Sequence, residues 1–384
     1  LHSFPTRRSS DLGKNMDYDL LIKNGQTVDG MPVEIAIKEK KIAAVAATIS
    51  GSAKETIHLE PGTYVSAGWI DDHVHCFEKM ALYYDYPDEI GVKKGVTTVI
   101  DAGTTGAENI HEFYDLAQQA KTNVFGLVNI SKWGIVAQDE LADLSKVQAS
   151  LVKKAIQELP DFVVGIKARM SRTVIGDNGI TPLELAKQIQ QENQEIPLMV
   201  HIGSAPPHLD EILALMEKGD VLTHCFNGKE NGILDQATDK IKDFAWQAYN
   251  KGVVFDIGHG TDSFNFHVAE TALREGMKAA SISTDIYIRN RENGPVYDLA
   301  TTMEKLRVVG YDWPEIIEKV TKAPAENFHL TQKGTLEIGK DADLTIFTIQ
   351  AEEKTLTDSN GLTRVAKEQI RPIKTIIGGQ IYDN

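Results

Sequence analysis

The sequence predicts an α/β fold, a (β/α)8 TIM barrel with a small composite β-sandwich domain built from both chain ends. From Trp69 onward, apolar strand-like runs alternate with polar segments of helical length, which is typical of βαβ units. Eight such runs can be counted, the number that closes a barrel. Short alternating runs with no helical segments between them occupy both ends of the chain.

The barrel prediction covers residues 68–330. Between its strand-like runs, Pro182–Glu192 and Leu209–Lys218 carry apolar residues at helical spacing, which predicts outer helices. A doubly wound open sheet is the structural alternative, but no run is followed by the glycine fingerprint of a nucleotide site. The eight runs are Trp69–His75, Val96–Ala102, Asn123–Ile130, Phe162–Arg169, Ile196–Ile202, Val221–Phe226, Val253–Ile257 and Ala280–Ile286.

The composite domain is predicted from residues 16–67 and 331–384. Both stretches carry short runs that indicate small antiparallel β-structure. Residues 1–15 are set apart, because His2–Leu12 resembles a translated sequencing adapter; this segment is either non-native or disordered. The terminal runs are Tyr18–Ile22, Glu34–Ile37, Lys41–Val45, Thr56–Leu59, Gly334–Ile338, Ala342–Phe347 and Ile373–Ile377.

Composition narrows the classes of partner. The 384 residues include 40 basic and 55 acidic side chains, a net charge of -15, which disfavours nucleic acid and anionic membranes. No apolar run reaches the roughly 18 residues of a bilayer span. Cys76 and Cys225 are too few for a disulfide framework, which fits a reducing compartment. We expect a cytoplasmic protein that acts on a small molecule, and the sequence leaves a homo-oligomer open.

The first barrel run carries two histidines at alternate positions, in Gly68-Trp-Ile-Asp-Asp-His73-Val-His75. Side chains alternate between the two faces of a strand, so His73 and His75 share one face and can reach one metal ion. Two histidines at this spacing also occur on protein surfaces. The rest of the chain must therefore decide between the two interpretations.

The fourth run embeds Lys167 in an apolar stretch, where an unpaired ammonium would carry a large desolvation cost. One interpretation is a lysine that pairs with a nearby carboxylate or extends toward solvent. The other is a neutral amine that reacts with carbon dioxide to give an anionic carbamate. The two oxygens of that carbamate can bridge two cations.

Three more candidates lie on later runs. His201 and His224 fall near the ends of the fifth and sixth, at the carboxyl edge where barrel enzymes assemble their sites. Asp285 follows the alternating apolar positions of the eighth. A single buried histidine is more often structural, and an isolated aspartate can cap a helix. Together with the three earlier candidates, however, the set favours a metal site.

This ordered set resembles the amidohydrolase superfamily: His-x-His on strand one, lysine on four, histidines on five and six, and aspartate on eight. The likeness covers the chain from Asp17 onward, since Gly334–Phe347 (GTLEIGKDADLTIF) resembles the strand pair that closes the composite domain of these enzymes. Residues 68–330 are therefore expected to form a metal-dependent hydrolase barrel.

The resemblance implies two divalent metal ions. The strand-one histidines would hold the more buried ion, the strand-five and strand-six histidines the other, and the N6-carboxylated lysine would bridge both. The aspartate would ligate the first ion, accept the proton of the bridging water as catalytic base and later return it to the leaving group. Zinc suits imidazole-rich coordination, with manganese, iron or cobalt as alternatives. The implied ligands are His73, His75, Lys167, His201, His224 and Asp285.

Departures from well-known branches bear on the substrate. Dihydroorotases usually carry an arginine where Phe77 stands, and adenine deaminases generally lack the bridging lysine, so Lys167 argues against purine deamination. The runs Lys167-Ala-Arg169-Met-Ser and Asn293–Met303 resemble a dihydroorotase-like group that has been linked to deacylation of small acylated hydroxy acids.

The resemblance therefore implies a hydrolase that cleaves an amide or ester bond in a small carboxylate-bearing substrate, with a hydroxide activated by the two metals. A deacetylase of acylated hydroxy or amino acids, or a cyclic amidase, fits this description. A dihydroorotase and an adenine-type deaminase are the enzymatic alternatives. A non-catalytic scaffold is disfavoured, because such proteins typically lose ligands and every ligand position here is filled.

Two residues are expected to contact the substrate. Arg169 follows Lys167 by two positions on the same strand face, so it could bind a carboxylate, with Arg172 and Arg289 as alternates. The competing interpretation is an arginine paired with a loop carboxylate. His259 follows the seventh run, where it contacts either substrate or only the end of the barrel.

Overall fold

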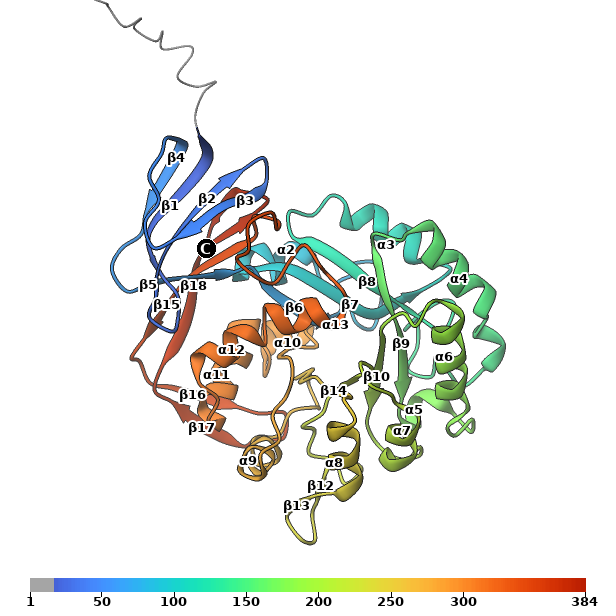
Figure 1. Ribbon diagram of the computed structural model, residues 1–384. Helices are drawn as coiled ribbons and strands as arrows, with labels where there is room; N and C mark the ends of the chain where they lie inside the picture. The colour runs from blue at the N-terminus through green and yellow to red at the C-terminus, as the bar shows by residue number, and fades with distance from the viewer. Residues whose placement is uncertain (1–16) are drawn as a thin grey trace, which may run out of the picture.

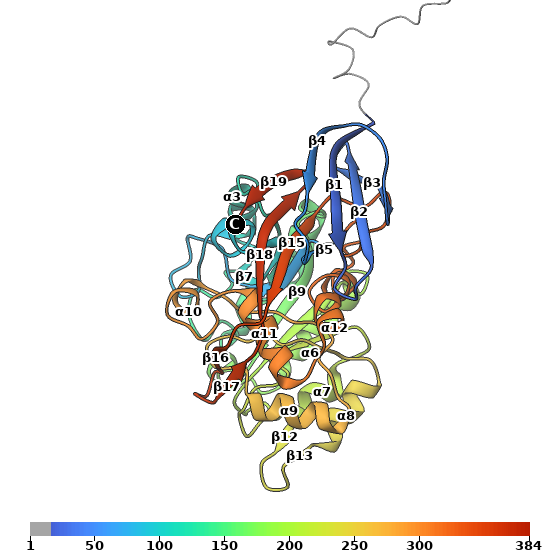
Figure 2. The ribbon, with the colours of Figure 1, turned by 90° about the vertical axis from the view of Figure 1, so that its left-hand side faces the viewer.

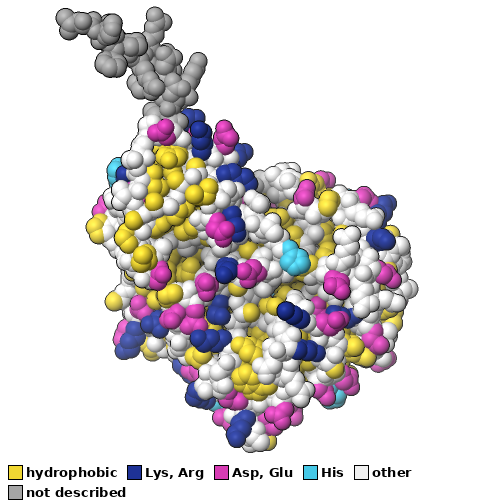
Figure 3. Space-filling model, viewed as in Figure 1, with side chains coloured by type: hydrophobic (Ala, Val, Ile, Leu, Met, Phe, Trp, Pro, Cys, Tyr) yellow, Lys and Arg dark blue, Asp and Glu magenta, His cyan; other side chains and the backbone are white. Residues whose placement is uncertain are grey.

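The computed structural model describes residues 17–384 (Figure 1). The segment 1–15, predicted from sequence to be non-native or disordered, lies outside the described residues. Among those described, no helix has both the length and the apolar character to cross a membrane. Acidic and basic side chains are interspersed over the face shown in Figure 3.

Both chain ends contribute to one connected β-sheet, in the strand order β19-β18-β15-β5-β1-β2-β3, with β4 beside β1. Figures 1 and 2 show the N-terminal strands lying against the C-terminal ones. Apolar side chains from both ends, including Ile22, Ile35, Leu344 and Ile376, form one buried cluster. The strands are β1 (Tyr18–Gln26), β2 (Pro32–Lys38), β3 (Lys41–Ala46), β4 (Ala53–His58), β5 (Thr63–Ala67), β15 (Leu344–Gln350), β18 (Gln369–Ile377) and β19 (Gln380–Asp383).

The composite domain departs from the predicted antiparallel pattern at β1, which pairs in parallel with both β4 and β5. β4 pairs with β1 in parallel, with Leu20 opposite Glu55 and Ile22 opposite Ile57. The residues between β3 and β4 form no strand and carry the chain back, so β4 enters the sheet in the same direction as β1. Two small hairpins were also not predicted, β12–β13 (Leu234–Asp235, Lys240–Ile241) and β16–β17 (Lys354–Thr357, Thr363–Ala366).

The central layer is a curled parallel sheet in the strand order β14-β11-β10-β9-β8-β7-β6. Its order follows the chain, as in a barrel built from successive βα units. The strands are β6 (Trp69–Val74), β7 (Val96–Gly106), β8 (Asn123–Asn129), β9 (Val163–Met170), β10 (Leu198–Ile202), β11 (Val221–Thr223) and β14 (Val254–Phe255).

The eighth predicted run, Ala280–Ile286, closes the barrel without forming a regular strand. It makes parallel bridges to both edges of the sheet, Asp256 to Ser281 and Val74 to Ile286. The Asp285 amide donates to the His73 carbonyl at 2.6 Å. This backbone bond fixes Asp285 beside the first barrel strand.

Helices surround the barrel (Figure 1), and their apolar sides pack on the strands; Leu183 and Ile212 are fully buried in this way. They are α2 (Pro87–Ile90), α3 (Ile110–Ala117), α4 (Ala149–Glu158), α5 (Arg172–Ile175), α6 (Thr181–Glu192), α7 (Leu209–Leu215), α8 (Asp243–Asn250), α9 (Phe266–Glu275), α10 (Ile288–Asn293), α11 (Leu299–Val309), α12 (Trp313–Glu318) and α13 (Lys322–Asn327), with 3-10 turns at Val92–Lys94 and Leu144–Lys146.

A separate apolar cluster, with Ile100, Leu127, Met199 and Phe328 among its members, fills part of the barrel interior. Most of its members lie on barrel strands, and Phe328 follows α13 directly. The polar residues of the site follow these positions toward the carboxyl ends of the strands, so they meet at one end of the barrel.

Candidate metal centre and active-site pocket

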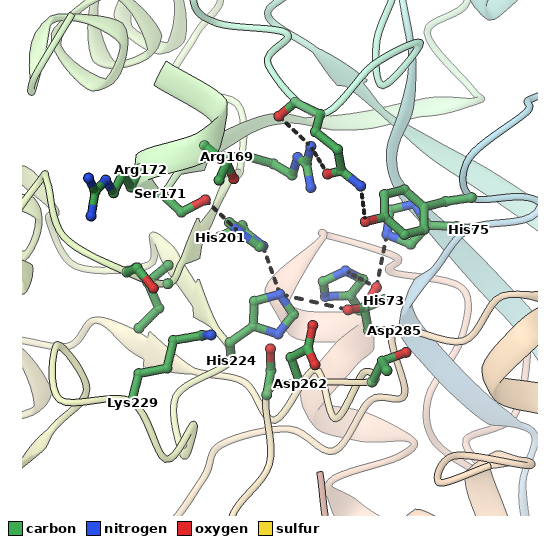
Figure 4. Close-up of a pocket in the computed structure, with 18 of the residues that line it drawn as sticks. His73, His75, Arg169, Ser171, Arg172, His201, His224, Lys229, Asp262 and Asp285 are labelled. Atoms are coloured by element: carbon green, nitrogen blue, oxygen red, sulfur yellow. Dashed lines mark hydrogen bonds and ion pairs between the residues drawn. The ribbon is translucent and has the colours of Figure 1, made fainter. Parts of the chain in front are cut away.

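A pocket of about 400 Å3 opens at the carboxyl ends of the barrel strands. All six residues predicted as metal ligands line it, and Figure 4 shows the side chains of five of them, labelled, converging on one region. The six are His73, His75, Lys167, His201, His224 and Asp285.

The histidines of β6 point their Nε2 atoms at one carboxylate. Asp285 Oδ1 lies 3.1 Å from His73 Nε2 and 3.0 Å from His75 Nε2. This arrangement confirms that alternation places His73 and His75 on the same face of the strand.

Each of these imidazoles is also held by a hydrogen bond at its Nδ1 atom. His73 Nδ1 lies 2.8 Å from Thr223 Oγ1, and His75 Nδ1 lies 2.8 Å from Thr104 Oγ1. The two threonine hydroxyls in turn donate to buried carboxylates, Asp256 at 3.0 Å and Asp101 at 2.8 Å. Since each hydroxyl donates to its carboxylate, its oxygen is left to accept Nδ1–H, which keeps the Nε2 lone pair directed into the pocket.

The histidines of β10 and β11 lie together on the other side of the pocket. His201 Nδ1 is 2.8 Å from His224 Nε2, and His224 Nδ1 is 2.6 Å from the Gly258 carbonyl. Burial lowers the pKa of both imidazoles below the usual value, by a large margin for His201. Both are therefore neutral near pH 7 and able to offer a lone pair to a cation.

Asp285 occupies a left-handed backbone conformation, with φ 53°. Burial by itself raises the pKa of this carboxyl, but the adjacent His73 and His75 lower it well below the usual range. Gly260 lies so close that a Cβ there would be 2.6 Å from Asp285 Oδ2. A glycine at this position therefore allows the loop after β14 to pass beside the carboxylate.

Lys167 is fully buried and lines the pocket. Its Nζ donates to the Ala102 carbonyl at 2.8 Å. Burial lowers the pKa of its amine to about 8, because the charged form is poorly solvated there. Gly103 makes room for the side chain, since a Cβ at residue 103 would lie 2.5 Å from Lys167 Cβ.

These donors fit a divalent cation. Ligand atoms of His73, His224 and Asp285 all lie within 4.8 Å of one another. Neutral imidazoles with Nδ1 tied back, together with an ionised carboxylate, form the nitrogen and oxygen donor set that zinc and similar ions prefer.

Arg169 lies in the pocket wall, but its guanidinium is already bound. Nε and Nη2 donate to Glu140 Oε2 and Oε1, both at 2.7 Å. Glu140 sits in the loop after β8, so the interpretation of an arginine paired with a loop carboxylate is the one that the structure shows. The expected contact between Arg169 and a substrate carboxylate stays a prediction, and in that contact Arg169 would have to act while bound to Glu140 or leave it.

His259 points away from the pocket. Its Nδ1 lies 2.8 Å from the Gly260 carbonyl and its Nε2 lies 2.8 Å from Lys305 Nζ. The ring stacks on Phe264 with centroids 5.0 Å apart. This position agrees with a histidine that holds the end of the barrel, and the expected contact of His259 with substrate stays a prediction.

Several pocket residues were not singled out from the sequence. Lys229 and Asp262 come from the loops after β11 and β14, and Tyr83 follows β6. The anticipated alternate Arg172 also lines the pocket, whereas Arg289 is exposed outside it. Residues on irregular loops follow no periodic pattern, so the sequence did not indicate that these residues line the pocket. The sequence does indicate that one such loop begins between His224 and Gly228.

Known proteins resemble this chain in sequence and in fold. A deacetylase from Agrobacterium fabrum is 35% identical over 344 residues, covering 88% of this chain and 84% of the relative. A deacetylase from Brucella anthropi is also 35% identical, over 89% of this chain and 86% of its own length. The chain belongs to the deacetylase group of the amidohydrolase superfamily.

Further matches agree with this assignment. A solved structure described as a dihydroorotase matches this amidohydrolase with a TM-score of 0.88 and 33% identity, covering 95% of this chain and 97% of the other. Residues 336–383 match the family model of a deacetylase-like composite domain. The predicted fold class and family are confirmed.

Proposed function

We propose that this amidohydrolase hydrolyses an acyl bond in small carboxylate-bearing compounds, with N- or O-acetylated amino and hydroxy acids as the first candidates. The convergence of four histidines, Lys167 and Asp285 on one pocket carries this proposal. Two relatives at 35% identity are named deacetylases, which supports an acyl substrate. The pocket volume of about 400 Å3 suits a small molecule.

The proposed cofactors are two divalent metal ions, with zinc as the first choice. His73, His75 and Asp285 would hold one ion and His201 with His224 the other, while Lys167, N6-carboxylated, would bind both. When bound, such ions lower the pKa of water and polarise a carbonyl group. The buried amine of Lys167, whose pKa is lowered to about 8, supports carboxylation because only the neutral amine reacts with carbon dioxide.

The chain itself would supply the proton transfers. Asp285 has a pKa well below its usual range, so it is ionised at neutral pH and can accept a proton from the attacking water. It can then deliver that proton to the leaving nitrogen or oxygen. Thr104 and Thr223 keep the β6 imidazoles in one orientation throughout this cycle.

Hydrolysis of a cyclic amide is the second candidate. The structure described as a dihydroorotase, at 33% identity, favours it. Against it, Phe77 stands where the resemblance leads us to expect an arginine, and Phe77 is buried against Phe113, with ring centroids 5.4 Å apart. The Phe77 side chain therefore offers no hydrogen-bond donor or positive charge to a substrate carboxylate.

A substrate screen with metal-loaded protein tests the proposal. Purified protein would be analysed for bound metal and then supplied with N-acetyl amino acids, O-acetyl hydroxy acids, cyclic amides and purines. Release of acetate that is abolished by a chelator supports the proposal. Ring opening of cyclic amides without acetate release would favour the second candidate, and ammonia release from purines would contradict both.

A further inference from the structure

The basic side chains of the active-site pocket differ in how they are paired. Lys167 donates to a backbone carbonyl and Arg169 is bound to Glu140. Lys229 and Arg172 also line the pocket, and within residues 17–384 neither side chain has a hydrogen-bond or ion-pair partner. The acidic residues of the pocket, Asp262 and Asp285, are not within 4.0 Å of either cation. Two positive charges are thus left for a ligand.

Arg169 is poorly suited to a second carboxylate. The Nε and Nη2 edge of its guanidinium is used by Glu140 at 2.7 Å, and Nη2 also donates to the Gln138 carbonyl at 3.4 Å, so Nη1 alone is without a hydrogen-bond partner among the described residues. The Glu140 side chain is fully buried, so releasing it would leave a carboxylate charge without solvent or a partner. A basic residue without a counter-charge is therefore better suited to bind a substrate anion.

The backbone of Lys229 is tied to one of the pocket histidines. Asn227 donates through Nδ2 to the His224 carbonyl at 2.9 Å, and its Oδ1 accepts the Lys229 amide at 3.0 Å. The Lys229 carbonyl accepts from the Gly232 amide at 2.9 Å. These hydrogen bonds hold the backbone of Lys229 in place next to His224, although Lys229 lies on a loop.

The two unpaired cations point in different directions. In Figure 4 the Lys229 ammonium is directed toward His224 and His201, whereas the Arg172 guanidinium extends away from the histidines. Lys229 is half-buried and Arg172 is exposed. An ammonium that is partly withdrawn from water gains more from an anionic partner than one that is fully solvated.

We propose that Lys229 is the residue that binds the anionic group of the substrate, at the His201–His224 side of the pocket. The inference rests on the proposed function, because it names the group that recognises a carboxylate-bearing acyl compound. The chemical class is an acylated acid whose free carboxylate lies beside the bond to be cleaved. A carboxylate that takes no part in bond cleavage contributes equally to ground and transition states, so its loss should appear in KM rather than in kcat.

The test compares matched substrates that differ only in charge. N-acetylglycine would be paired with N-acetylglycinamide, and O-acetyl-lactate with O-acetyl-lactamide. Lys229→Met should lower kcat/KM about 10- to 100-fold for the anionic member of each pair, through KM, and leave the neutral member nearly unchanged. Lys229→Arg should keep most of the preference for the anion.

Two further variants serve as comparisons. Lys218→Met makes the same change in net charge at an exposed lysine that does not line the active-site pocket, and it should behave as the wild type. Arg172→Met tests the other unpaired cation of the pocket. If Arg172→Met, and not Lys229→Met, produces the charge-selective loss, the assignment to Lys229 is wrong. Equal losses on charged and neutral substrates with Lys229→Met would also overturn it.

A binding measurement keeps this test separate from turnover. Calorimetry on metal-loaded protein should show that Lys229→Met weakens the binding of lactate about 10- to 100-fold. The binding of lactamide should be unaffected. If the wild type cleaves none of the acyl compounds, the proposed function fails, and the lactate result still decides on Lys229. Unchanged lactate affinity in Lys229→Met would refute the anion site even if deacylation is observed.

Discussion

The ion pair between Arg169 and Glu140 gives a prediction whose size follows from the structure. The Glu140 side chain is 0% exposed and that of Arg169 is 8% exposed, and two bonds of 2.7 Å join them. Glu140→Leu would leave the guanidinium buried without a counter-charge. Removing one partner of such a pair costs about 3–5 kcal/mol of the free energy of unfolding.

Urea and thermal unfolding of metal-loaded protein would measure this effect. A loss of that size lowers Tm by about 5–10 °C in a domain of this length. The double variant Arg169→Met with Glu140→Leu should recover most of the loss, since it removes both charges. As a control, the exposed pair Lys79 and Glu112, 57% and 51% exposed, should make almost no contribution, so Glu112→Gln should leave the free energy of unfolding nearly unchanged.

Two results would refute this reasoning. One is a Glu140→Leu variant as stable as the wild type, or a double variant no more stable than the single one. The other is an Arg169→Met variant with unchanged Tm and a selective loss on carboxylate-bearing substrates. That outcome would show that the guanidinium leaves Glu140 to bind substrate, as the sequence first suggested.

Three further outcomes are expected. Lys167→Ala should lose both bound metal and turnover, and added short carboxylic acids should partly restore the two. A variant that keeps two metals per chain and normal rates would contradict the proposed carbamate at Lys167. Asp285→Asn should retain most of the metal while kcat falls by roughly 10²-fold. A near-normal rate would show that another residue transfers the proton. Burial lowers the pKa of Lys305 from 10.5 to about 7, so between about pH 7 and 10 the unfolded chain binds more protons and stability rises with pH. Urea unfolding should show that rise in the wild type relative to Lys305→Met, and a pH-independent difference would count against it.

The sequence predicts the barrel well because most of its strands are continuous apolar runs. The runs starting at Val96 and Asn123 correspond closely to β7 and β8. The run Ala280–Ile286 was placed correctly in the fold, yet only isolated bridges join it to its neighbours. The small polar residues Ser281, Ser283 and Thr284 donate through their hydroxyls to Asp256 and Asp71 on the two neighbouring segments of the barrel. This use of hydroxyls cannot be read from periodicity.

The site was predictable where residues belong to the strand-like runs and not where they lie on the loops between these runs. His73 and His75 follow from alternation along one strand. Glu140, which binds Arg169, sits in an irregular loop, so no period connects the two positions in the sequence. Thr104 and Thr223 look like ordinary strand residues, because threonine favours strands for reasons unrelated to the imidazoles they hold.

The composite sheet has a consequence for how the chain folds as it is synthesised. The Trp69 amide bonds Thr345 Oγ1 across 276 residues, and β5 pairs with β15 over the same span. Until β15 leaves the ribosome, β5 has an open edge, and Ile22 and Ile35 lack the cover that Leu344 provides. Contacts of such long range close slowly, so this sheet forms after synthesis is nearly complete. Chains that end before Leu344 should therefore aggregate through that open strand edge.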